Sequence, residues 1–108
     1  MIINEVTEGK KIPYVLMGNM IFFNNEMLFN LEKYERDYAI SIDVCEDENF
    51  MLVNGLGRRY VAQVQIPARE YTEKIEDEEN TEDEQENPEL VPVPFDMDKV
   101  TLNLWGLD

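Results

Sequence analysis

The chain has 108 residues, of which 44% are hydrophobic and 31% are charged, and its formal net charge is −15. At this length one hydrophobic core is expected, so residues 1–108 are predicted to form a single domain. The negative charge argues against direct binding of nucleic acid and against adhesion to an anionic membrane, because both need clustered Lys and Arg. The single Cys45 cannot form an internal disulfide, which is typical of proteins of a reducing cytoplasm.

The first predicted elements are two strands joined by a tight turn. Residues 12–23 read IPYVLMGNMIFF, in which Gly18 and Asn19 separate two apolar runs. Such a break is typical of a β-hairpin, because glycine adopts the positive φ of tight turns. Residues 26–37 are ambiguous, since their apolar side chains fit both a helical stripe and strand alternation. We favour a strand followed by a charged turn at residues 32–37.

Alternating apolar and polar residues predict three further strands, at residues 38–45, 59–66 and 100–105. Pro67 ends the second of them, because proline has no N–H to donate to the ladder. Two prolines restrict residues 90–95 to an edge strand or a strap over the sheet. These elements predict a mainly β fold of six or seven strands, arranged as a single antiparallel β-sandwich or an open barrel of hairpins.

A long acidic loop is predicted at about residues 70–89. This segment contains eleven carboxylates and one lysine, a net charge of −10, whereas the rest of the chain carries −5. Like charges in a segment of low hydrophobicity favour a solvated loop. One interpretation is therefore a loop that only raises solubility.

The other interpretation is that the acidic segment imitates a nucleic-acid strand and occupies a basic groove on another protein. Alternate residues of an extended strand are about 6.6 Å apart, close to the spacing of successive phosphates. Tyr71 lies where the β-like residues enter the segment, and tyrosine is enriched at binding hot spots. The predicted partner-binding residues are Tyr71, Glu76, Asp77, Glu78, Glu79, Glu82, Asp83, Glu84 and Glu86.

The residues of common catalytic and metal sites are missing from the sequence. The chain has no histidine, which removes the usual base of a hydrolytic triad and the commonest zinc ligand. Cys45 and Ser41 lie in a predicted strand without a histidine partner. The GLGRR sequence at residues 55–59 precedes a strand, so it indicates a hairpin turn and not a phosphate-binding loop.

Calcium is the one metal that the acidic segment could bind, judged from its residue types. Asp77, Glu79 and Thr81 have roughly the spacing of a calcium loop, but the glycine of its sharp turn is missing. Weak binding stays open, and no specific metal site, cofactor or catalytic residue is predicted. The protein is expected not to be an enzyme.

Three stretches outside the acidic segment, taken as a set, resemble small uncharacterised proteins encoded by phages and mobile elements of Gram-positive gut bacteria. They are IPYVLMGNMIFF at residues 12–23, YVAQVQIPAREY at residues 60–71 and VPVPFDMDKVTLNLW at residues 91–105. The resemblance covers most of the chain outside the acidic segment. It implies a phage or mobile-element accessory protein in the bacterial host cytoplasm, and no functional residue is carried over with it.

Small size, acidity and the lack of catalytic residues are also the profile of many inhibitors of bacterial defence, anti-CRISPR proteins among them. We therefore expect a non-enzymatic accessory protein that acts by protein–protein interaction, as an acidic decoy for a basic, nucleic-acid-binding host defence protein. The alternative is a virion or assembly component that self-associates into a homo-oligomer through its β edges. In that case the acidic segment is only a solvated loop.

Overall fold

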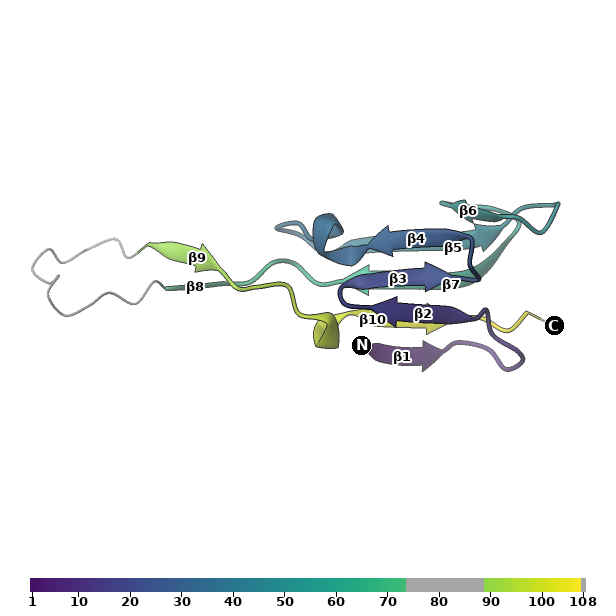
Figure 1. Cartoon of the computed structure of the whole chain (residues 1–108), viewed down its shortest axis with the longest axis horizontal. Coiled ribbons are helices and arrows are strands. Elements are labelled where there is room, and N and C mark those ends of the chain that lie inside the picture. Colours follow the sequence, from purple (N-terminus) through teal and green to yellow (C-terminus); the bar gives the residue numbers. More distant parts are fainter. Residues whose placement is uncertain (74–88, 108) are drawn as a thin grey trace, which may run out of the picture.

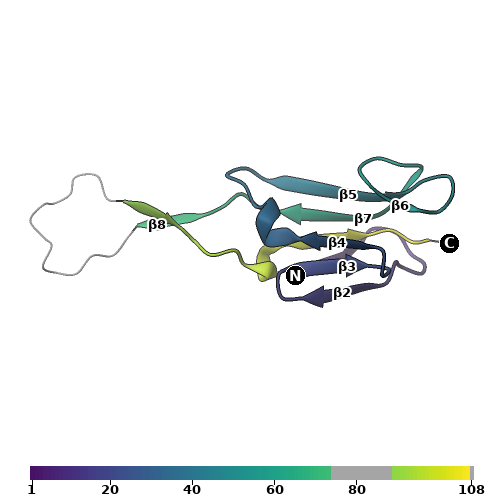
Figure 2. The same ribbon diagram turned by 45° about the horizontal axis from the view of Figure 1, so that its top comes forward.

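The computed structural model describes residues 1–73 and 89–107 and has a mainly β fold. A five-stranded sheet of order β1-β10-β7-β5-β6 and a three-stranded sheet of order β2-β3-β4 stack in two layers (Figure 1). A third sheet pairs β8 with β9 beyond one end of the layers (Figures 1 and 2). None of these sheets closes into a barrel. Of the two expected architectures, a β-sandwich and an open barrel, the two layers therefore form the β-sandwich.

The described residues form ten strands and two short 3₁₀ helices. They are β1 (Ile2–Glu5), β2 (Tyr14–Met17), β3 (Met20–Phe23), β4 (Met27–Asn30), η1 (Leu31–Tyr34), β5 (Ile40–Glu46), β6 (Leu52–Asn54), β7 (Arg59–Ile66), β8 (Tyr71–Glu73), β9 (Leu90–Pro92), η3 (Met97–Lys99) and β10 (Thr101–Leu104).

The core lies between the two layers and is built from alternate residues of the strands. Ile42 pairs with Val64 and Val64 with Leu102, so these three side chains form one row across β5, β7 and β10. From the opposite layer, Phe23 and Phe29 pack edge to face with ring centroids 6.2 Å apart. All five side chains are at most 5% exposed, and burial of each contributes roughly 1.5–3 kcal/mol of transfer free energy. The alternation predicted for these strands is confirmed.

The predicted hairpin at Gly18 and Asn19 joins β2 to β3. Met17 pairs with Met20 across it, and Gly18 has a φ of 60°, which fits a turn whose first central residue is glycine. The strand favoured within residues 26–37 is β4. Leu31 then begins η1 and is fully buried, so part of the expected charged turn is a short 3₁₀ helix that contributes to the core.

The strands β1 and β8 were not predicted from the sequence. β1 runs parallel to β10, with Ile3 opposite Leu102. The five-stranded sheet is therefore mixed, with the parallel β1–β10 pair added to the mainly antiparallel pairing that the sequence predicted. β8 consists of three exposed residues at the start of the acidic segment, where the sequence predicted a loop.

The β8–β9 ribbon, called the arm below, leaves the sandwich roughly along the direction of its strands (Figure 1). Thr72 pairs with Val91 at its centre. Within residues 90–95 the structure forms β9, an edge strand that ends at Pro92 and does not lie as a strap over the sandwich. Residues 74–88, which hold most of the predicted acidic loop, lie outside the described residues.

A row of polar side chains crosses the outer face of the five-stranded sheet. Asn4 donates to Asn103 at 3.0 Å, Asn103 donates to Gln63 at 3.1 Å, and Gln63 donates to Asp43 at 3.0 Å. Asn103 also donates to Gln65 at 3.0 Å and is only 8% exposed. Because the amides satisfy one another, this face stabilises the pairing of four strands.

Candidate functional site at the base of the arm

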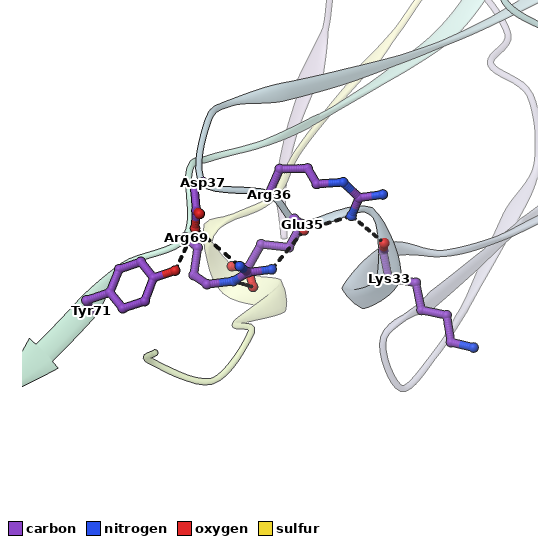
Figure 3. A network of polar contacts seen from close by, with 6 residues as sticks. All are labelled: Lys33, Glu35, Arg36, Asp37, Arg69 and Tyr71. Atoms are coloured by element: carbon purple, nitrogen blue, oxygen red, sulfur yellow. Dashed lines mark hydrogen bonds and ion pairs between the residues drawn. The ribbon is translucent and has the colours of Figure 1, made fainter. Parts of the chain in front are cut away.

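The arm leaves the sandwich through contacts centred on Arg69. Pro67 follows the end of β7, and the backbone N–H of Arg69 then donates to the carbonyl of Arg36 at 2.8 Å. The guanidinium forms ion pairs with Glu35 at 3.5 Å and Asp37 at 3.2 Å, and it donates to the carbonyl oxygen of Glu35 at 3.0 Å. Figure 3 shows how the loop between η1 and β5 supplies all three acceptors. The segment that begins the arm is therefore fastened to the loop after η1.

Tyr71 extends these contacts to the first residue of β8. Its hydroxyl donates to Oδ1 of Asp37 at 2.6 Å, the oxygen that also faces Arg69 (Figure 3). The pKa of Arg69 is raised, and the largest cause is a hydrogen bond with the Tyr71 hydroxyl. Asp37 and Glu35 raise it further, whereas desolvation lowers it. The Tyr71 side chain is still 45% exposed. The ring is therefore held at its hydroxyl and remains open to a partner.

The loop that receives Arg69 is closed by its own hydrogen bonds. Nη1 of Arg36 donates to the carbonyl of Lys33 at 2.8 Å and to the carbonyl of Glu35 at 2.9 Å (Figure 3). These bonds cover carbonyl groups at the end of η1, which a short helix leaves without intrahelical partners. Glu35 and Asp37 are thus presented from a turn with few remaining conformations.

A second set of contacts fastens the returning chain. Nζ of Lys99 lies 2.9 Å from Oε1 of Glu70, and the N–H of Val93 donates to the carbonyl of Glu70 at 2.8 Å. The hydrogen bond that Lys99 donates to Glu70, together with the charge of Glu70, raises the pKa of Lys99. A single exposed ion pair contributes little stability. The ion pairs of Arg69 and Lys99, however, lie together where the two strands of the arm meet the sandwich. We define the arm base as Glu35, Asp37, Arg69, Glu70, Tyr71 and Lys99.

The cleft beside the arm base is too small to hold a substrate. It is lined by apolar residues such as Ile66 and Phe95 and by Glu70 and Lys99, and it offers about 20 Å³ to the centre of a water-sized molecule. That volume holds about one water, whereas ligand pockets measure roughly 300–1,000 Å³. The arm base is therefore better suited to positioning the arm than to enclosing a small molecule.

The structure describes one of the nine predicted partner-binding residues. Tyr71 lies in β8 and belongs to the arm base. The other eight, which are all carboxylates of the acidic segment, lie outside the described residues: Glu76, Asp77, Glu78, Glu79, Glu82, Asp83, Glu84 and Glu86.

Sequence reasoning missed the other members of the arm base. Glu35 and Asp37 lie in the predicted charged turn, and Arg69 and Glu70 follow Pro67, so their charges were visible in the sequence. Glu35 and Arg69 are 34 residues apart in the sequence and meet only because the chain folds back. No local sequence pattern predicts such a contact. The charge of Arg69 close to the acidic segment was the one available signal.

The nucleophile candidates occupy structural positions. Cys45 is 1% exposed in β5. The pKa of its thiol is raised, chiefly by burial and further by the charge of Asp43. A hydrogen bond with the backbone of Gly57 acts in the opposite direction. Since the reactive form of cysteine is the thiolate, this thiol is poorly suited to nucleophilic attack. Ser41 lies in β5 opposite Gln65.

The glycine-rich segment connects β6 to β7 through residues 55–58, and Arg59 begins β7. These two strands lie on opposite sides of β5 in the sheet, so the connection is not the hairpin turn that the sequence predicted. The carbonyl of Glu46 accepts from the N–H of Arg58 at 2.7 Å, and its side chain pairs with Arg59 at 2.9 Å. Within residues 1–73 and 89–107, no three Cys, Asp or Glu side chains are grouped as metal ligands. The same part of the chain has no helix of the length and hydropathy that a membrane crossing requires.

Comparisons with protein-family models, with curated protein sequences and with solved structures give no match to this chain.

Proposed function

We propose that this protein is a non-enzymatic accessory protein of a phage or mobile element that acts as an acidic decoy. It presents the acidic segment to a basic, nucleic-acid-binding surface of a host defence protein in the bacterial cytoplasm and blocks that surface. The single observation that supports this proposal best is the arm base. Two ion-pair systems, at Arg69 and at Lys99, hold both ends of the arm.

The charge distribution supports a role beyond solubility. Residues 74–88 carry eight carboxylates and one lysine in the sequence. The two cations of the arm base, Arg69 and Lys99, already pair with Glu35, Asp37 and Glu70, so their charge is balanced within the arm base. A net charge of magnitude about 2–8 keeps a small domain soluble, and the chain outside residues 70–89 carries −5. The concentrated charge is therefore available for steering towards a cationic partner.

Anchoring the arm favours binding because it lowers the cost of association. A segment that is free at both ends loses conformational entropy when it binds. At the arm base, the backbone bond of Arg69, the side-chain bond of Tyr71 and the ion pair of Lys99 fix the start and the return of the arm. The exposed Tyr71 ring then lies next to the charged segment, where it adds apolar contact area.

The small cleft and the buried thiol favour a binding role over catalysis. The cleft at the arm base has room for about one water, and burial raises the pKa of Cys45. An enzyme without histidine would need activated carboxylates in a concave site. The described residues of the arm form an extended ribbon and not a concave site.

The test compares two variants that each lose four negative charges. The arm-neutral variant changes four glutamates of the acidic segment to glutamine: Glu76, Glu78, Glu82 and Glu84. The body-neutral variant makes the same change at four exposed glutamates of the sandwich: Glu8, Glu26, Glu32 and Glu48.

The readout is the release of labelled DNA from a basic, DNA-binding defence protein of the host. We expect the wild type and the body-neutral variant to release the DNA, and the arm-neutral variant to lose this effect at least about tenfold. Release should also weaken as salt rises, because charges screen over about 8 Å at physiological ionic strength. If both variants release the DNA as well as the wild type does, the segment is only a solvated loop and the decoy is refuted.

A further inference from the structure

β2 is a free edge strand with an unusually apolar surface. It borders the three-stranded sheet, and no strand lies beyond it in that sheet (Figure 2). Val15, Leu16 and Met17 are consecutive and are 52%, 43% and 49% exposed. Natural edge strands are generally protected by charge, proline or a bulge, because their open backbone groups pair with other chains. β2 itself contains none of these protections.

The hydrogen-bond pattern shows which backbone groups of β2 are open. Met17 pairs with Met20 across the two-residue turn, and the N–H of Asn24 donates to the carbonyl of Pro13 at 2.8 Å. Antiparallel ladders alternate between hydrogen-bonded and non-hydrogen-bonded pairs. Positions 13, 15 and 17 therefore bond to β3. The N–H and C=O groups of Tyr14 and Leu16 point outward, away from the sheet.

The other edges of the two layers are better protected. β1 ends in Glu5, which pairs with Lys11 at 3.8 Å, so a charged pair lies on that edge. β6 has only three residues. β4 is followed at once by η1, whose Leu31 turns into the core. In the part of the chain that the structure describes, β2 is thus the edge best suited to strand addition.

A second copy of this chain fits the edge because of its charge. The whole molecule carries −15, so most surfaces of two copies repel each other. Residues 12–25 contain no charged side chain. A two-fold axis places an element against itself, and a neutral apolar strand meets its own copy without a buried or repulsive charge.

We propose that two copies of the protein pair antiparallel through β2 and form one continuous six-stranded sheet. Tyr14 of each copy would form a hydrogen-bonded pair with Leu16 of the second copy, because these are the residues with outward backbone groups. Val15 then lies opposite Val15 of the second copy, in the non-hydrogen-bonded pair on the two-fold axis. The ladder in β2–β3 requires that outward residues pair with outward residues, and of the registers that satisfy this, the Tyr14–Leu16 pairing uses both outward residues of β2 in each copy.

The size of this contact predicts a weak dimer. A four-residue edge strand and its flanking side chains bury less than the roughly 1,200 Å² of a standard stable interface. We therefore expect dissociation constants in the micromolar range. The apolar row continues from Val15 through Phe22 to Leu28 across the outer face of the sheet. Because the axis is perpendicular to the strands, the two arms would project from opposite ends of the dimer.

A cysteine scan tests the register directly. Val15→Cys places two thiols on the axis, and non-hydrogen-bonded antiparallel pairs have Cα atoms about 4.5 Å apart, within the range of a disulfide. Leu28→Cys is the matched control, since Leu28 and Val15 are both 52% exposed and Leu28 lies on the opposite edge strand. Under mild oxidation we expect Val15→Cys to form a disulfide-linked dimer at least about tenfold faster than Leu28→Cys. Equal rates would overturn the register.

Sedimentation velocity tests the dimer itself. The wild type should show a sedimentation coefficient that rises with concentration into the hundred-micromolar range. Leu16→Pro should stay monomeric, because proline removes an outward N–H that β3 does not use. If circular dichroism shows that this variant does not fold, Val15→Glu takes its place, since it sets two carboxylates against each other on the axis. A wild type that stays monomeric over the whole range overturns the proposal.

Discussion

Removing the hydroxyl of Tyr71 should loosen the arm without affecting the sandwich. Tyr71→Phe deletes the 2.6 Å hydrogen bond to Asp37. A buried bond to a charged group is worth about 1.5–3 kcal/mol. Here the tyrosine is 45% exposed and the Asp37 side chain 65% exposed, so water competes and about 0.5–1 kcal/mol is expected. Because the arm opens locally, this loss should appear in local exchange and not in global unfolding.

Native-state hydrogen exchange measures this effect. The N–H groups of Arg69 and Val93 are bonded at the arm base, and their exchange should accelerate about two- to fivefold. Amides of β7 should exchange at unchanged rates. Tyr38→Phe is the matched control, because Tyr38 is 62% exposed and its hydroxyl has no hydrogen bond among the described residues. The proposed anchoring is wrong if Tyr71→Phe, like Tyr38→Phe, leaves the two arm amides unchanged.

Two further predictions concern the sandwich. Asn103→Ala removes the centre of the amide row and should lower the free energy of unfolding by about 1–3 kcal/mol in urea titrations, whereas an unchanged midpoint would show that water replaces those bonds. Burial raises the pKa of Cys45 above its ordinary value of 9.0. The unfolded thiol therefore ionises first, and stability should be constant below that pH and fall as the pH rises towards the native pKa. Cys45→Ala should show a shallower fall; equal alkaline slopes would contradict the cause given for the shift.

The central strands were predictable because their side chains face two environments. β5, β7 and β10 each bury one face against the other layer, so every second residue is apolar. The hairpin between β2 and β3 was predictable from Gly18, whose positive φ the turn requires. In both cases the physical constraint acts within a few residues, and a local pattern records it.

The strands that escaped prediction lack this constraint. β1 is exposed along its whole length and pairs in parallel with β10, almost a hundred residues away. β8 is exposed too, and its partner β9 follows the acidic segment. Of the candidate site, Tyr71 and the acidic segment were visible as composition. The ion pairs of Arg69 were not, because they depend on how two loops meet in space.

The most direct test of the central claim is the comparison of the arm-neutral and body-neutral variants in the DNA-release assay, at equal concentrations and at two salt levels. Both variants lose the same charge, so a difference between them reports where the charge lies and not how much there is. The account predicts release by the body-neutral variant, at least about tenfold weaker release by the arm-neutral variant, and weaker release by both at high salt. Equal release by the two variants, insensitive to salt, would contradict it.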